Sequence, residues 1–141
     1  MPNFNEEEQM LRSLNTVGLL FLLTVLPATS HASDAAIKAQ LLKLDPRTRL
    51  EQACDTEAMI RIKTDDNEFQ PDKVIAYTFR DPTYGKDAIT APGAVFRSRG
   101  EWYHLSFKCQ TGPKHVDVRQ LSYAIGGKVA RANWDRYFLY D

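Results

Sequence analysis

The chain lacks an excess of charge of either sign. Its 141 residues contain 18 Lys and Arg and 18 Asp and Glu, so the formal net charge is zero. The first 32 residues contribute −2, from Glu6, Glu7, Glu8 and Arg12, which leaves about +2 for the remainder. A balance this small argues against the strongly basic surface that binds nucleic acid or an anionic membrane. We therefore expect no nucleic-acid partner.

Cysteine and histidine are scarce. The two cysteines, Cys54 and Cys109, are not spaced as C-x-x-C, which argues against a thioredoxin-like redox site. After residue 32 the only histidines are His104 and His115, and two cysteines with one nearby histidine do not make a zinc site.

Catalytic motifs are also missing. There is no G-x-S-x-G turn, and Gly126-Gly127-Lys128 lacks the Walker spacing and the following Ser or Thr. His104 and Ser106 are two residues apart on the same face of one strand, about 7 Å from each other, which is too far for direct activation of the hydroxyl. The sequence thus predicts no catalytic residue, no metal ligand and no cofactor, and favours a protein that is not an enzyme.

A short apolar segment from Val17 to Leu26 indicates export. Its ten residues carry no charge, too few for a bilayer span of about 20 but typical of a signal peptide. Pro27 breaks the helix, and Ser30-His31-Ala32 places small residues at the −3 and −1 positions, so cleavage is expected after Ala32. The alternatives are a buried core helix or an uncleaved anchor.

The first residues do not fit a signal peptide, because three glutamates stand where positive charge is expected. A well-formed signal peptide begins at Met10, and we therefore hypothesise that translation starts there. Residues 33–141 would then be one domain, periplasmic or secreted, with no stable membrane span after cleavage. In such an oxidising compartment Cys54 and Cys109 are expected to form one disulfide.

Helix signals come first in the exported part. Asp34 is a candidate cap for a short helix with an apolar stripe at Ile37, Leu41 and Leu44. The phase then breaks at Asp45-Pro46, which has the residues of a helix start.

A second helix is expected from Pro46 to about Ile62. Leu50, Cys54 and Ala58 lie on one face of it, so Cys54 points at whatever the helix covers. The carboxylates on or before this helix, Asp45, Glu51 and Asp55, are interpreted as a solvated face.

Strand signals follow. Residues 74–79 place Ile75, Tyr77 and Phe79 on one face, and 81–93, rich in Pro and Gly, is expected to be a long mobile connection. A hairpin turns at Arg99-Gly100, so Ser98 pairs with Glu101, Arg97 with Trp102, Phe96 with Tyr103, Val95 with His104, and Ala94 with Leu105. This register puts Phe96, Tyr103, Leu105, Phe107 and Cys109 on the covered side.

Two more strands complete the expected sheet. Residues 116–125 change phase midway, which predicts a bulge near Arg119-Gln120. Residues 134–140 are a candidate last strand. The predicted fold class is α+β: an N-terminal helix, or a broken pair, packed on a four- to five-stranded antiparallel sheet. It is cystatin-like or a small, partly closed barrel.

Three stretches carry a family resemblance: residues 44–59 (LDPRTRLEQACDTEAM), 94–111 (AVFRSRGEWYHLSFKCQT) and 134–141 (WDRYFLYD). With residues 71–77 (PDKVIAY), they resemble the exported alphaproteobacterial domains of domain-of-unknown-function family 930. The resemblance covers nearly all of residues 33–141, and both cysteines stand at similar places. It implies a rhizobial-type bacterium and a periplasmic or secreted setting, and it brings no activity.

The candidate ligand or partner surface is the outer sheet face with Arg97, Trp102, His104 and Lys108. Arg97 opposite Trp102 predicts a cation–π pair, and an exposed Trp among cations suits an envelope glycan or a periplasmic protein. The alternative is an ordinary outer face, covered by residues 134–140.

The function expected from the sequence is that of a non-enzymatic binding or envelope-associated module, using the outer sheet face and the connection 81–93. The alternative is a hydrolase or transferase of envelope polymers.

Overall fold

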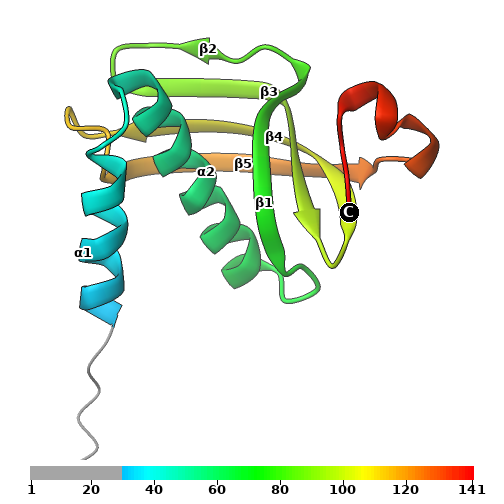
Figure 1. Ribbon diagram of the computed structural model, residues 1–141, viewed down its shortest axis with the longest axis horizontal. Helices are drawn as coiled ribbons and strands as arrows, with labels where there is room; N and C mark the ends of the chain where they lie inside the picture. Colours follow the sequence, from blue (N-terminus) through cyan, green and yellow to red (C-terminus); the bar gives the residue numbers. More distant parts are fainter. Residues whose placement is uncertain (1–29) are drawn as a thin grey trace, which may run out of the picture.

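The computed structural model describes residues 30–141, which form two helices and a five-stranded antiparallel sheet (Figure 1). Helices α1 (Ser30–Leu41) and α2 (Pro46–Asp65) precede all the strands. The predicted α+β fold is confirmed, and the sheet is not closed into a barrel. The apolar segment from Val17 and the start at Met10 lie outside the described residues. Within these residues, no helix is long and apolar enough to cross a membrane.

Helix α2 begins where the sequence predicts. Oδ1 of Asp45 accepts hydrogen bonds from the backbone N–H groups of Arg47 and Thr48, both at 3.1 Å. These bonds satisfy donors that the start of a helix leaves free, and Pro46 needs no such partner. The helix runs to Asp65, slightly beyond the expected end.

Helix α1 is tied to α2 by polar contacts more than by its apolar stripe. Leu41 is buried as expected, whereas Ile37 is 43% exposed. Arg49 of α2 donates hydrogen bonds to the carbonyl oxygens of Leu41 and Leu44, at 3.1 and 2.7 Å. These bonds hold the end of α1 against the start of α2.

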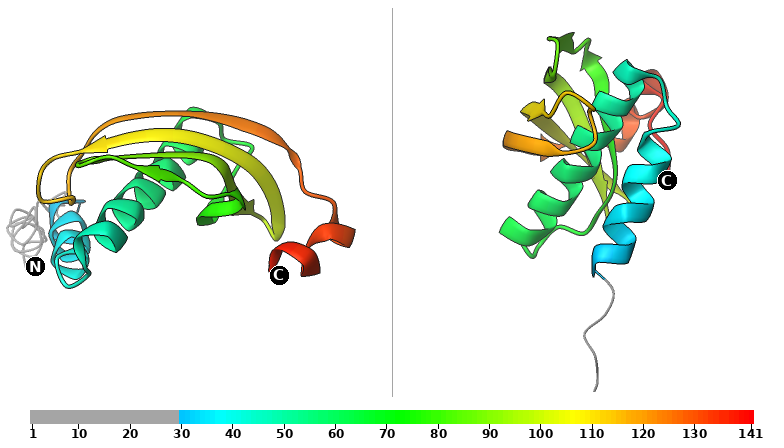
Figure 2. Two further views of the ribbon diagram at one scale, coloured as in Figure 1. Left: turned by 90° about the horizontal axis from the view of Figure 1, so that it is seen from above. Right: turned by 90° about the vertical axis from the view of Figure 1, so that its left-hand side faces the viewer.

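The strands are arranged in the order β1-β3-β4-β5, so β1 and β5 are the edges of this order, and β2 pairs with another part of β3. Their bounds are β1 (Pro71–Arg80), β2 (Thr83–Tyr84), β3 (Ala88–Ser98), β4 (Glu101–Thr111) and β5 (Val118–Lys128). The sheet is strongly curved and arches over α2, which lies on its concave side (Figure 2).

The β3–β4 hairpin has the predicted register, from Ser98↔Glu101 to Ala94↔Leu105. Both turn residues, Arg99 and Gly100, have positive φ, at 53° and 75°, as a type I′ turn requires. The predicted bulge in β5 is also present, because the pairing with β4 skips Arg119.

The region 81–93 is more ordered than predicted. It contains β2 and the first half of β3, with a register shift between Ala91 and Ala94. A Cβ on Gly93 would lie 2.2 Å from the backbone nitrogen of Arg80, so glycine is required by this close approach. The prediction of a long connection was wrong because Pro92 and Gly93 lie in this irregular part of β3, where both are tolerated.

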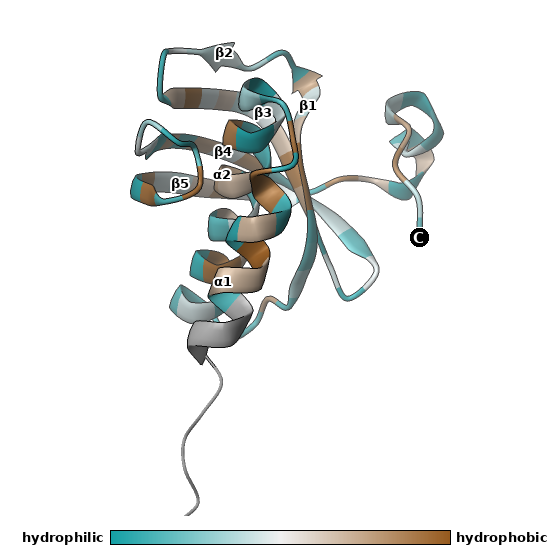
Figure 3. Ribbon diagram, turned by 60° about the vertical axis from the view of Figure 1, so that its left-hand side comes forward, coloured by the Kyte–Doolittle hydropathy of each residue, from teal (hydrophilic) through white to brown (hydrophobic). Residues whose placement is uncertain are grey.

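The main core lies between α2 and the concave face of the sheet. The Cys54–Cys109 disulfide joins them, with a Cα–Cα distance of 6.0 Å. Along α2, hydrophobic and hydrophilic residues alternate around the helix (Figure 3). The buried cluster is formed by Leu50, Cys54, Ala58, Ile62, Val74, Ala76, Ile89, Ala91, Ala94, Phe96, Leu105, Phe107 and Cys109.

A second cluster lies on the opposite face of the sheet, under the C-terminal segment, residues 129–141. This segment contains two 3-10 turns, Arg131–Asn133 and Asp135–Tyr137, and no strand, so the predicted last strand was wrong. It is tethered to β4 by Val129, whose backbone N–H donates a hydrogen bond to the carbonyl oxygen of Trp102 at 2.8 Å. Within the segment, Nε1 of Trp134 donates to the carbonyl oxygen of Val129 at 3.1 Å. The buried members are Val95, Trp102, Val129, Trp134 and Leu139.

Candidate functional site

The structure does not leave the predicted outer face open. Trp102 is fully buried, and its Nε1 donates a hydrogen bond to the carbonyl oxygen of Tyr140 at 2.9 Å. The prediction of an exposed Trp102 is therefore wrong. The alternative, a face covered by the C-terminal segment, is confirmed around this residue.

The other three predicted surface residues, Arg97, His104 and Lys108, have different surroundings. The Arg97 guanidinium lies 5.6 Å from the Trp102 ring and bonds both carboxylate oxygens of Asp72, at 2.9 and 3.1 Å. His104 is exposed, with its ring 4.4 Å from that of Phe79, and Lys108 is exposed further along β4. Their assignment to a binding surface stays a prediction.

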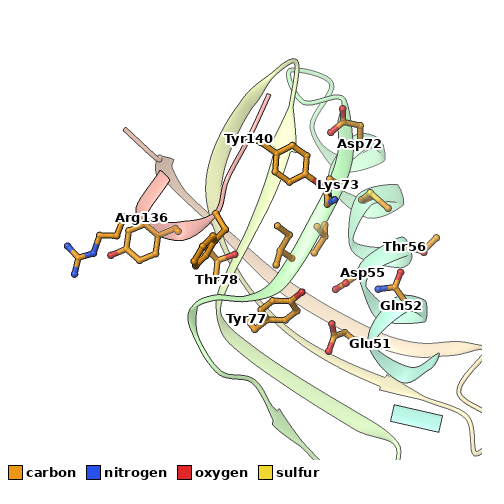
Figure 4. A pocket seen from close by; sticks show the side chains of 15 residues that line it. Glu51, Gln52, Asp55, Thr56, Asp72, Lys73, Tyr77, Thr78, Arg136 and Tyr140 are labelled. Carbon is orange, nitrogen blue, oxygen red and sulfur yellow. Dashed lines mark hydrogen bonds between the residues drawn. The ribbon is translucent and has the colours of Figure 1, made fainter. Parts of the chain in front are cut away.

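A groove of about 810 Å³ lies instead between α2, β1 and the C-terminal segment (Figure 4). Its size is typical of ligand sites, and the sequence did not indicate it. It is lined by Glu51, Gln52, Asp55, Thr56 and Met59 of α2, by Asp72, Lys73, Val74, Ile75, Tyr77 and Thr78 of β1, and by Arg136, Tyr137, Phe138 and Tyr140.

The β1 side of the groove follows the edge of the strand. Consecutive side chains of a strand point to opposite faces of the sheet, so a groove on one face is lined by alternate residues. Here Asp72, Lys73, Val74 and Ile75 all line it. Val74 belongs to the core under α2 and Ile75 packs against the cluster on the other face. The groove therefore runs beside the outer edge of β1.

That edge has no backbone partner in the part of the chain that the structure describes. Within residues 30–141, β1 pairs only with β3, and no other backbone or side-chain group bonds to its main chain. The pairing jumps from Ile75↔Val95 to Arg80↔Gly93, so residues 76–79 lie opposite the single residue Ala94 in an irregular part of the pairing. Free N–H and C=O groups on such an edge are a template for another strand.

Asp55 lies on the α2 wall of the groove and is only 5% exposed. Its Oδ1 is buried and has no hydrogen-bond partner among the described residues. Burial, and secondarily the charge of Glu51, raise the pKa of Asp55 to about 8. At neutral pH the side chain is therefore mostly a carboxylic acid, which can donate as well as accept a hydrogen bond. The interpretation of Asp55 as part of a solvated face was wrong.

Glu51, one turn before Asp55, forms the rest of this acidic end of the groove. Its Oε2 accepts a hydrogen bond from the Tyr84 hydroxyl, and the Arg47 guanidinium lies 4.0 Å from the Tyr84 ring centroid. Burial and the bond to Glu51 raise the pKa of Tyr84 to about 12, so the hydroxyl keeps its proton. No cation forms an ion pair with Glu51 or Asp55 within residues 30–141.

The cations of the groove lie toward its other end and are engaged there. Lys73 donates a hydrogen bond to the Tyr140 hydroxyl, and its Nζ lies 4.8 Å from the Tyr140 ring centroid. The Arg136 side chain extends away from α2 (Figure 4). The groove is thus acidic near Glu51 and Asp55, and aromatic and basic near Tyr140.

Three exposed aromatic residues surround the groove. Tyr77 is 57% exposed, Tyr140 50% and Phe138 87%. Phe138 also has a φ of 55°, in the left-handed region that phenylalanine rarely adopts. Thr78 adds a buried hydroxyl without a hydrogen-bond partner among the described residues. Such unpaired polar groups beside exposed aromatics are features of a ligand-binding surface.

One pattern in the sequence could have indicated this site. Glu51, Asp55 and Met59 form a stripe at i, i+4 and i+8, immediately beside the predicted buried stripe of Leu50, Cys54 and Ala58. Methionine at the end of that stripe indicates that this side is also covered. No comparable signal marks β1 as the edge strand, because the order of strands in a sheet depends on contacts between residues that are far apart in the sequence.

Comparison with known proteins identifies the family. A family model matches residues 41–139, from the end of α1 to the C-terminal segment. The chain belongs to the Domain of Unknown Function (DUF930) family. Nothing matches among the curated proteins or the solved structures. All the residues that line the groove of this DUF930 domain lie inside the matched region, apart from Tyr140. Residues 30–141 contain no group of three or more His, Cys, Asp or Glu side chains arranged to hold a metal ion.

Proposed function

We propose that this DUF930 chain is an exported, non-enzymatic binding module that takes an extended polypeptide segment along the outer edge of β1. The observation that carries the proposal is the groove that follows both faces of β1 at an unpaired edge. A peptide strand bound there would satisfy main-chain groups of β1, as in other cases of strand addition. The regular part of β1 lies between the register shifts at Asp72 and at residues 76–79, so an added strand would bond mainly to the main chain of residues 73–75.

The groove also offers contacts for the side chains of such a segment. The exposed rings of Tyr77, Phe138 and Tyr140 supply apolar area at its rim. The left-handed conformation of Phe138 places a large apolar side chain in solvent at a conformational cost of order 1–3 kcal/mol. A role in contacting a ligand would account for it.

Strand addition can be tested with blocked heptapeptides of alternating Thr and Val, measured by fluorescence anisotropy on protein expressed from the full chain. N-methylation removes main-chain donors, and alternate residues of an added strand donate toward β1. Methylating one set of alternate amides should abolish binding, and methylating the other set should leave it nearly unchanged. Equal effects of the two sets, or no binding of any heptapeptide, would overturn the proposal.

Phe138→Gly is the informative protein variant, because it removes an exposed side chain and relieves the positive φ. The fold should be as stable as before or more stable, while peptide affinity falls several-fold. Ile60→Ala is the matched control: Ile60 is 50% exposed on α2 and lies outside the groove. Its affinity should not change.

Export is part of the proposal and rests on the apolar segment Val17 to Leu26 and on the disulfide. A periplasmic extract of a bacterial host should contain a product that begins at Ser33. Recovery of the full-length chain in the membrane fraction would contradict export with cleavage.

One observation favours a second candidate, a hydrolase or transferase of envelope polymers. Asp55, which burial keeps as a carboxylic acid at neutral pH, lies one helical turn from Glu51, and an acid beside a second carboxyl group is the arrangement of a general acid and its partner. Incubation with muropeptides and acidic glycans separates the candidates. Turnover that is lost in Asp55→Asn supports an enzyme, and saturable binding without turnover supports the binding module.

A further inference from the structure

The acidic end of the groove consists of two carboxyl groups without a cation. Glu51 and Asp55 are one helical turn apart and have no ion-pair partner within residues 30–141. Like charges at this spacing destabilise each other when both are ionised. A cation placed between them would relieve this repulsion and would give Oδ1 of Asp55 a partner.

The cations already in the groove do not fill that place. Lys73 bonds the Tyr140 hydroxyl, and Arg136 extends away from α2 (Figure 4). Arg97, next to the groove, is bonded to Asp72, and Arg47 lies over the ring of Tyr84. With the phenols of Tyr77, Tyr84, Tyr137 and Tyr140, these are the charged and titratable side chains that line the groove or contact its walls.

We infer that the Glu51–Asp55 end of the groove binds the primary amine or guanidinium of a Lys-type or Arg-type side chain carried by the bound segment. The inference rests on the proposed function and adds a side-chain preference to it. Tyr77, exposed beside the acidic end (Figure 4), offers a ring face along which the alkyl part of that side chain can lie.

Binding of the cation must compete with a proton. In the free protein Asp55 holds its proton up to about pH 8 because it is buried and Glu51 is nearby. A lysine amine stays charged throughout this range, so its binding to the ionised form of Asp55 releases a proton. The preference for a cationic peptide should therefore grow by up to tenfold per pH unit between pH 6 and 8 and level off above pH 8.

Three blocked heptapeptides of Thr and Val that differ only at the central residue test this inference. The central residue is lysine, arginine or norleucine, and binding is measured by anisotropy at pH 6, 7, 8 and 8.5. We expect the lysine and arginine peptides to bind at least tenfold more tightly than the norleucine peptide at pH 8.5. Calorimetry at pH 6 in buffers of different ionisation enthalpy should show that close to one proton is released, and only with the cationic peptides.

Variants of the acidic residues test which of them cause the preference for the lysine peptide. Asp55→Asn should remove the pH dependence and most of the preference for lysine, measured as the ratio of the lysine-peptide affinity to the norleucine-peptide affinity in the same variant. Glu51→Gln should weaken the preference. Glu57→Gln makes the same change of charge on α2 outside the groove, and should leave the preference unaltered.

The two proposals fail in different ways. Equal affinity for the three peptides at every pH overturns the amine site and leaves strand addition standing. Absence of binding by all three peptides overturns strand addition. In that case an NMR titration with butylammonium chloride, with potassium chloride as the ionic control, still tests the amine site. A shift of the Glu51 and Asp55 resonances with butylammonium but not with potassium supports the site. Identical spectra with the two salts overturn it.

Discussion

Replacing Asp55 by Asn should change how the stability of the protein depends on pH. The carboxyl group has a pKa near 3.8 in an unfolded chain and about 8 in the folded protein. Between these values the folded protein binds one proton more than the unfolded chain. The free energy of unfolding therefore falls as the pH rises, by about 1.4 kcal/mol per unit.

Over the whole interval the loss amounts to about 6 kcal/mol, which is comparable to the total stability of a small domain. This loss of stability is absent below about pH 3.8 and complete above about pH 8. Asn has nearly the same shape and no charge, so Asp55→Asn should remove this loss. We expect the variant and the original protein to be similarly stable at pH 4, and the variant to be more stable by at least about 2 kcal/mol at pH 8.

Urea denaturation at pH 4, 5, 6, 7 and 8 measures this difference directly. Other groups titrate in the same range, but their contributions cancel when the two proteins are compared at each pH. Asp45, for example, has a lowered pKa because of its bonds to Thr48, so its contribution runs in the opposite direction and is lost in acid. Parallel stability curves for the two proteins would refute the assignment of Asp55 as a buried acid.

Three further predictions concern the fold. Reduction of Cys54–Cys109 should cost about 4 kcal/mol and lower the melting temperature by roughly 15 °C, because it opens a loop with a sequence separation of 55. Mass analysis of the exported protein should show no free thiol, and two alkylated cysteines would contradict the disulfide. Trp102→Ala should be as destabilising as Phe107→Ala, about 3–5 kcal/mol each in denaturant melts, since both side chains are buried. If Trp102→Ala lost less than half the stability that Phe107→Ala loses, the outer face would be open. Gly93→Ala should destabilise by more than 2 kcal/mol, because its Cβ would collide with main chain; a melt like that of the original protein would contradict the close packing there.

The sequence predicts the hairpin well because its signals are local. The turn at Arg99-Gly100 and the period-two alternation that follows it define the register, and the phase change near Arg119 reveals the bulge in β5. Cys109 lies on the covered side of the sheet and Cys54 on the apolar side of α2, so the expected disulfide between them places α2 on the correct face. These inferences need no knowledge of strand order.

The burial of Trp102 could not be predicted in this way. Alternation assigns it to the face opposite the core, which is correct, but its cover comes from a segment some thirty residues later. That segment folds into 3-10 turns, and Phe138 directly after them adopts a left-handed conformation, which no periodic pattern indicates. The groove depends on the same segment and on β1 being an edge strand, so it also lies beyond what local patterns predict.

Hydrogen exchange of the peptide complex tests the central claim most directly. The protein is exchanged with and without the blocked lysine heptapeptide at pH 8, and the protection of each strand is compared. An added strand should slow exchange at those amides of Asp72–Thr78 that point away from β3, and should leave β5, the other edge strand, unchanged. Protection confined to β5, or spread evenly over the sheet with no gain in β1, would contradict the account.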